Sequence, residues 1–183
     1  MKKNLIIYSP GQFQSWGTLN DTIMGGKSSS NIINSDKGLL FEGETVSDSG
    51  GFVSCRSNKL SPPIDLSLYK GVQIDLDGNG LILKLAIRCK SLKFSLAQLI
   101  SPNLRWVNTF KTNENGVTSI KIPFKSFKPA VRAKPVSIPI RFNTSEILQF
   151  QLLYSKFGNP GELNQEFISA KFKIIVRSIS AYS

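Results

Sequence analysis

The segment from Trp16 to Ser30, WGTLNDTIMGGKSSS, combines side chains that an ordinary turn would not need. Its Asn, Asp and Ser residues can form local hydrogen bonds, and its paired glycines tolerate positive φ. Met24 is an adaptable apolar contact, and Asp21 can fix the shape of a loop. We interpret the segment as a binding rim. Its candidate residues are Trp16, Asn20, Asp21, Met24, Gly25 and Gly26.

A purely structural role for the same residues is the alternative. In that case Trp16 fills the edge of the core, Asp21 closes an Asx turn, and the glycines permit tight backbone geometry. Arg56, which follows the sequence GGFVSC, is a further rim candidate. It is equally suited to a structural pairing with Asp21 or Asp65.

The complete absence of histidine limits the chemistry that this chain can perform. It removes the commonest general base, the commonest zinc ligand and every nucleophile that depends on a histidine partner. The sequence also contains no P-loop, no GxGxxG and no CxxC motif. We expect a protein that is not an enzyme, with no metal site and no cofactor. The two cysteines, Cys55 and Cys89, are expected to be buried thiols rather than a disulfide.

Positive charge is concentrated in the middle third of the chain. Residues 84–141 hold twelve basic side chains and one acid, Glu114, so this block accounts for the whole net charge of +11. The candidate basic patch consists of Lys84, Arg88, Lys90, Lys93, Arg105, Lys111, Lys121, Lys125, Lys128 and Arg132, and Lys134 and Arg141 complete the block. Three interpretations remain open: a solvated surface, contact with anionic lipid headgroups, or contact with an RNA backbone.

Alternating apolar and polar residues predict a fold made of short strands. GVQIDLD at residues 71–77 and LILKLAIR at residues 81–88 both alternate with period two, and DGNG at residues 77–80 predicts a hairpin turn between them. Further strands are expected at 39–46, 51–57, 93–100, 104–111, 117–122, 147–154 and 171–179. Short strands separated by turns indicate an all-β sandwich or jelly roll.

Helical signals are weak by comparison. Only residues 61–69 and 145–148 suggest a helical turn, and neither is long enough for a stable helix. Three prolines in residues 125–140 predict an extended connection rather than a central strand. With 183 residues and no linker, the chain is expected to form one domain over residues 1–183.

Several motifs follow one another in an order that resembles the complex I intermediate-associated protein 30 family. That family carries a W-x-x-x-N-D-x-x-M-G-G-x-S element and a G-G-F strand, which match Trp16–Ser28 and Gly50–Phe52. DLSLYKGV at 65–72 is similar to its D-L-S-x-Y-x-G segment, and IPFKSFKP at 122–129 to its I-P-F-x-x-F-x-P element.

This resemblance implies a galactose-binding-like β-sandwich that assists the assembly of large membrane complexes. Members of the family assist maturation of NADH dehydrogenase, and plant and cyanobacterial relatives are associated with photosynthetic complexes. The implied partners are protein subunits of such a complex during assembly. A carbohydrate-binding module and an RNA-binding factor remain alternatives.

The N-terminal sequence bears on location. In MKKNLIIYSPGQ the apolar run is limited to residues 5–8, whereas a signal peptide needs about 7–15 apolar residues. We therefore expect a cytoplasmic protein, with attachment to the periphery of the membrane as the alternative if the basic block contacts lipid.

Overall fold

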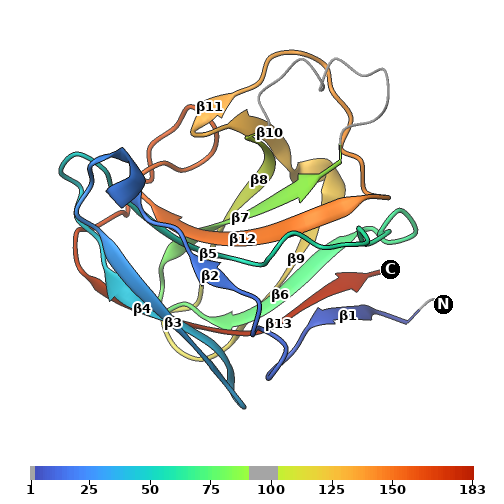
Figure 1. Ribbon diagram of the computed structural model, residues 1–183, viewed down its shortest axis with the longest axis horizontal. Helices are drawn as coiled ribbons and strands as arrows, with labels where there is room; N and C mark the ends of the chain where they lie inside the picture. Colours follow the sequence, from blue (N-terminus) through green and yellow to red (C-terminus); the bar gives the residue numbers. More distant parts are fainter. Residues whose placement is uncertain (1–2, 91–102) are drawn as a thin grey trace.

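Two antiparallel sheets face each other in the computed structural model, which describes residues 3–90 and 103–183 (Figure 1). The first sheet contains β1 (Leu5–Tyr8), β3 (Ser29–Ser35), β4 (Gly38–Glu44), β6 (Gly71–Asp77), β9 (Thr118–Pro123) and β13 (Lys171–Tyr182). Its order is β3-β4-β13-β6-β9, and β1 pairs with the end of β13.

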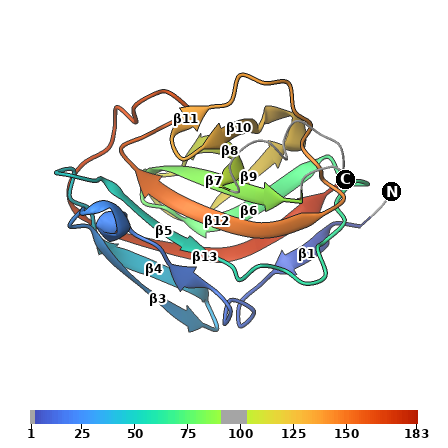
Figure 2. The same ribbon diagram turned by 45° about the horizontal axis from the view of Figure 1, so that its top comes forward.

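The second sheet has seven strands in the order β11-β10-β8-β7-β12-β5-β2. They are β2 (Gly17–Thr18), β5 (Phe52–Arg56), β7 (Ile82–Cys89), β8 (Leu104–Lys111), β10 (Lys128–Val131), β11 (Lys134–Pro135) and β12 (Ile147–Ser155). Figure 2 shows that this sheet is curved. β10 and β11 lie at one of its edges, and the short blue helix lies beside β5 at the other. The expected β-sandwich is confirmed.

The core lies between the sheets because alternate residues of each strand point inward. Ile74 and Leu76 from the first sheet meet Leu85, Phe150 and Tyr154 from the second, and all five are almost completely buried. Phe127 of the IPFKSFKP segment is buried in the same cluster. Two layers of apolar side chains therefore hold the sandwich together.

The hairpin expected at residues 77–80 is wrong. Asn79 and Gly80 do reverse the chain, with φ values of 51° and 79°. However, β6 pairs with β13 and β9, whereas β7 pairs with β12 and β8. The turn carries the chain from one sheet to the other, because a turn signal specifies reversal and not the strand's partner.

Of the helical turns expected at 61–69 and 145–148, the first is reduced to a single turn, in which the amide of Tyr69 donates to the carbonyl of Leu66 at 3.0 Å, and the second is wrong because Ile147 begins β12. Ile64 and Ile147 instead form a bridge, in which each amide donates to the other residue's carbonyl at 2.9 Å. The helical segments of the described chain are two 3-10 turns, η1 (Asp21–Met24) and η3 (Phe124–Ser126). Neither is long or apolar enough to cross a bilayer.

Other expectations are met. The proline-rich connection at residues 125–140 contains the end of η3 and the short strands β10 and β11, which lie at the edge of the second sheet. Cys55 is buried, Cys89 is half-buried, and both are free thiols. The strand expected at 93–100 lies outside the described residues.

A candidate binding groove on the seven-stranded sheet

A groove of about 400 Å³ lies on the outer face of the seven-stranded sheet. Its floor comes from side chains of β7, β8 and β12 that alternate with the core residues of the same strands. Leu19, η1 and the turn after β10 supply its walls. None of the described residues that line the groove is an Asp or a Glu.

Lys84 is the unusual residue of the floor. Its side chain is only 8% exposed, and no hydrogen bond or ion pair joins it to another described residue. Burial lowers the pKa of Lys84 to about 8 because the charged form loses hydration without gaining a partner. The protein thus keeps a poorly solvated cation at the bottom of an open groove.

Arg105 forms the cationic end of the groove, and Arg88 and Arg56 lie near it outside the lining. Cross-strand pairing places Arg88 opposite Gln149 and Arg56 opposite Gln151. Burial, together with the charges of Arg88 and Arg56, lowers the pKa of Arg105 to about 10. Arg105 remains charged at neutral pH, so Arg88 and Arg56 each repel its guanidinium group.

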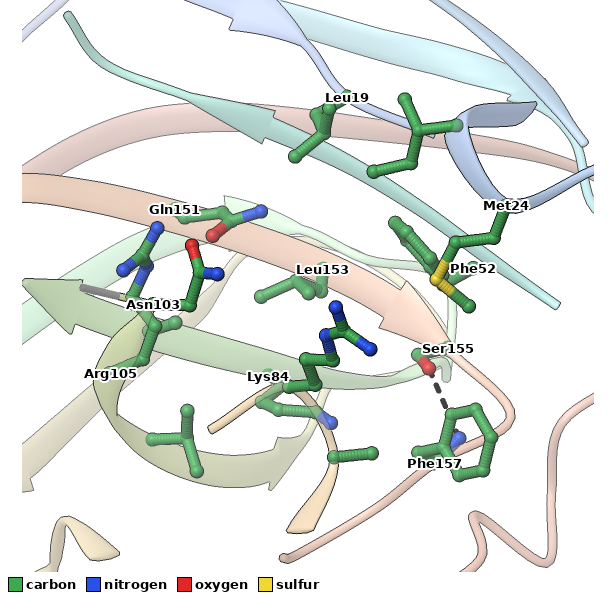
Figure 3. Close-up of a pocket in the computed structure, with 15 residues that line it drawn as sticks. Leu19, Met24, Phe52, Lys84, Asn103, Arg105, Gln151, Leu153, Ser155 and Phe157 are labelled. Atoms are coloured by element: carbon green, nitrogen blue, oxygen red, sulfur yellow. Dashed lines mark hydrogen bonds between the residues drawn. The ribbon is translucent and has the colours of Figure 1, made fainter. Parts of the chain in front are cut away.

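The opposite end is apolar. Figure 3 shows Met24, Phe52 and Phe157 gathered beside Ser155, with Leu153 and Lys84 between this end and Arg105. Ile23 also lines the groove, and it and Met24 are well exposed, Met24 at 60%. The groove therefore changes from apolar to cationic along β12.

The predicted rim segment is held by the carboxylate of Asp21. It accepts hydrogen bonds from the amide and hydroxyl of Ser28, at 3.0 and 2.7 Å. It also accepts from the amides of Gly51 and Phe52, at 2.6 and 3.3 Å. Burial opposes ionisation of Asp21, but these bonds outweigh it and lower the pKa below its ordinary value.

The glycines of the segment make room for this network. A side chain at Gly26 or Gly50 would collide with the carboxylate of Asp21, and Gly25 has a positive φ of 85° at the end of η1. Asp21 therefore joins the start of β5 to η1, which carries Met24 and Ile23 to the groove.

The remaining predicted rim residues occupy different surroundings. Trp16 is 6% exposed and packs edge-on against Tyr8 and Phe13. Asn20 accepts a hydrogen bond from Ser30 through its Oδ1, at 2.6 Å. Arg56 belongs to the arginine cluster, whereas Asp21 is engaged by backbone amides and Ser28. Of the predicted rim, Met24 alone is among the described lining residues.

The basic block is divided between several surfaces. Lys84, Arg105 and Arg132 line the groove, while Lys121 lies on β9 of the other sheet. Lys121 places its Nζ 5.3 Å from the centre of the Tyr182 ring.

Other members of the block are paired or lie apart. Lys90 forms an ion pair with Glu146 at 3.1 Å, and Lys111 pairs with Glu166 at 2.7 Å. Lys125 is in η3, Lys128 is in β10, and Lys93 lies outside the described residues.

Sequence reasoning did not select Gln151, Leu153, Ser155 or Phe157 as site residues. The alternation of β12 contained a usable signal, because residues that alternate with Phe150, Leu152 and Tyr154 must face outward. Among the described residues, no three His, Cys, Asp or Glu side chains lie close enough together to hold a metal ion.

The fold is a β-sandwich of the kind found in carbohydrate-binding modules. The family 11 carbohydrate-binding module of the cellulosomal cellulase Lic26A-Cel5E of Clostridium thermocellum has 17% identity and a TM-score of 0.67, with 99% of this chain and 95% of that chain covered. The same organism's family 11 module in complex with a β-1,3-1,4-mixed-linked tetrasaccharide has 18% identity and a TM-score of 0.66, covering 98% and 95%.

A more distant likeness joins this chain to part of the agarase AgWH50C. It has 8% identity and a TM-score of 0.63, and it covers 100% of this chain but 25% of the agarase. At these identities the likeness shows the fold alone. A comparison with curated proteins finds no match. The complex I intermediate-associated protein 30 (CIA30) family matches residues 7–173, and the chain belongs to that family.

The Asp21 network predicts a specific dependence of stability on pH. A carboxyl whose pKa is lowered on folding adds stability above its unfolded pKa of about 4, and this is lost as the pH falls through the folded pKa. Asp21→Asn should cost about 2–4 kcal/mol at pH 7, because the buried donors lose a charged acceptor. Urea unfolding from pH 7 to pH 2 should show a flatter pH profile for this variant.

Asp36→Asn serves as the control, since Asp36 is exposed. It should change the free energy of unfolding by less than about 0.5 kcal/mol. Equal losses in the two variants would show that the Asp21 network does not stabilise the fold.

The buried charge of Lys84 also predicts a rise of stability with pH, but at higher pH and with a destabilising contribution at pH 7. Because its pKa is lowered from 10.5 to about 8 on folding, the unfolded state binds more protons between these values and stability rises with pH there. Lys84→Met should raise the free energy of unfolding at pH 7 by about 1–3 kcal/mol and remove that rise.

Lys173→Met makes the same change of charge at an exposed position of β13. Its unfolding free energy should follow that of the unmodified protein from pH 7 to pH 10.5. If Lys84→Met lowered the free energy of unfolding, the charge of Lys84 would stabilise the folded protein, which would contradict the prediction.

Proposed function

We propose that this protein is a non-catalytic assembly factor that binds a protein subunit of a membrane-bound oxidoreductase or photosynthetic complex during its construction. Membership of the CIA30 family over residues 7–173 is the observation that carries the proposal. The family description names association with an intermediate of complex I. A factor of this kind needs a surface that recognises a client, and it needs no reacting groups.

The groove supports this role by its composition. Exposed Met24 and Ile23 lie beside Phe52 and Leu153, and methionine adapts its shape to different partner side chains. The charged end, with Arg105 and its neighbours, adds selectivity through charge complementarity. Aliphatic and cationic groups on one face suit a protein segment better than an uncharged sugar.

Carbohydrate binding is the second candidate, favoured by the likeness to the carbohydrate-binding modules. Sugar rings stack best on exposed aromatic faces, but both tryptophans, Trp16 and Trp106, are 6% exposed. The described aromatic residues of the groove are Phe52 and Phe157, at its apolar end. Titration with a mixed-linked tetrasaccharide tests this alternative directly.

The assembly role predicts which proteins accompany the chain in its own cells. Affinity purification of a tagged chain from detergent-solubilised membranes should recover subunits of an NADH dehydrogenase-type or photosynthetic complex. Deletion of the gene should lower the amount of the mature complex on a native gel. A clean purification together with normal complex levels would contradict the proposal.

Met24→Ala tests the contribution of the groove. Because Met24 is 60% exposed, the variant should fold with a stability change below about 0.5 kcal/mol and recover several-fold less client. Leu68→Ala is the matched control, since Leu68 is 70% exposed and does not line the groove. Equal recovery by both variants would exclude Met24 from the client contact.

A further inference from the structure

We infer that the groove binds an extended acidic segment of a partner protein, with an apolar side chain at one end and carboxylates at alternate positions toward the other. The inference rests on the proposed function, because it specifies the chemistry of the client segment. It is based on how the surroundings change along β12, from the apolar end at Ser155, past Leu153, to the cationic end at Gln151.

The centre of the groove calls for an anion. Lys84 is 8% exposed and has no partner among the described residues, although a buried charge is costly unless it is paired. The lowering of its pKa to about 8 reflects the free-energy cost of burying the charged form. A carboxylate from a bound segment would supply the missing counter-ion and restore the charged form.

The cationic end calls for a second anion. Arg88 and Arg56 both lie within electrostatic reach of Arg105, and no Asp or Glu is among the described residues that line the groove. A guanidinium group binds a carboxylate through two parallel N–H donors. A second acidic side chain at this end would relieve the repulsion among the arginines.

The apolar end of the groove suits an uncharged side chain of the bound segment. Met24, Phe52 and Phe157 surround Ser155 there, and the hydroxyl of Ser155 already accepts a hydrogen bond from the amide of Phe157 at 3.0 Å (Figure 3). A leucine-sized side chain would bury its surface against these groups. Burial of such a side chain favours binding by the hydrophobic effect.

The spacing of the three environments matches a peptide strand. Ser155, Leu153 and Gln151 succeed one another at every second residue of β12, a repeat of ~7 Å along a strand. Leu153 is paired with Lys84, and Gln151 is paired with Arg56. An extended peptide presents alternate side chains with the same repeat, so its residues i, i+2 and i+4 meet the apolar end, Lys84 and the arginines.

Gln151 can also serve the backbone of the segment. Its Nε2 donates to Ser54 Oγ at 2.9 Å, which fixes the amide, and among the described residues none donates a hydrogen bond to its Oε1 (Figure 3). That oxygen can accept a peptide N–H. Sugars and nucleotides would instead favour exposed aromatic rings, whereas most of the apolar lining is aliphatic.

The experiment uses two labelled pentapeptides with blocked ends and identical composition. Leu-Ser-Glu-Ser-Glu has the predicted spacing, and Leu-Glu-Glu-Ser-Ser does not. Fluorescence anisotropy should show at least about tenfold tighter binding of the first, and replacement of both glutamates by glutamine should remove it. Lys84→Met should weaken binding at least about tenfold, and Lys173→Met should leave it unchanged.

Calorimetry provides an independent reading of Lys84. At pH 8 the free protein holds Lys84 partly neutral, so binding of a carboxylate should draw a proton from the buffer. The measured enthalpy should then vary with the ionisation enthalpy of the buffer. Lys84→Met should abolish that variation, whereas a merely structural lysine would show none in the unmodified protein.

Several outcomes would overturn the inference. These are no binding up to about 1 mM, equal affinity for the two spacings, or equal affinity for the glutamine peptide. Tighter, Lys84-dependent binding of the mixed-linked tetrasaccharide, of single-stranded RNA or of phosphatidylserine vesicles would assign the groove to that ligand instead. Full client recovery by Lys84→Met in cells would leave the assembly role standing and place the client elsewhere. Peptide binding without any client in cells would support the groove and contradict the assembly role.

Discussion

The alternation of side chains along β12 from Phe150 to Ser155, beyond the irregularity between Ile147 and Gln149, governs both the interior and the proposed binding face. This strand lies between β7 and β5 in the second sheet, so its position is fixed on both sides by backbone hydrogen bonds. Its inward residues, Phe150, Leu152 and Tyr154, enter the core. Since a shift of one residue would exchange the two faces, burial of these side chains also fixes the outward register of Gln151 and Leu153.

Asp21 at the rim and Lys84 on the floor of the groove are both buried charges, but only Asp21 has hydrogen-bond partners among the described residues. Asp21 is surrounded by donors, and its hydrogen bonds join segments seven and thirty residues apart in sequence. Lys84 is also buried but has no partner among the described residues. The first charge stabilises the loop that carries Met24. Because burial lowers its pKa, the second is predicted to destabilise the free protein, which is typical of groups retained for binding.

Much of the fold followed from the sequence, whereas most of the groove did not. Strands with regular alternation, such as Gly71–Asp77, were predictable, but β3 is a polar edge strand with no apolar face to reveal it. The role of Asp21 depends on Gly51, thirty residues away, and the groove depends on pairings such as Leu153 with Lys84. Local patterns cannot specify such partners, since register and strand order emerge from the packing of the whole sheet.

The likeness to carbohydrate-binding modules and membership of the CIA30 family are compatible, because the sandwich and its outer face obey different constraints. Inward residues are restricted by packing, so distant sequences can share a fold. Outward residues are restricted only by solvent and by ligands. On this chain the outward positions of β7 and β8 include Lys84 and Arg105, while both tryptophans are buried. A scaffold shared with sugar-binding modules can therefore present a surface whose charges suit an acidic protein segment.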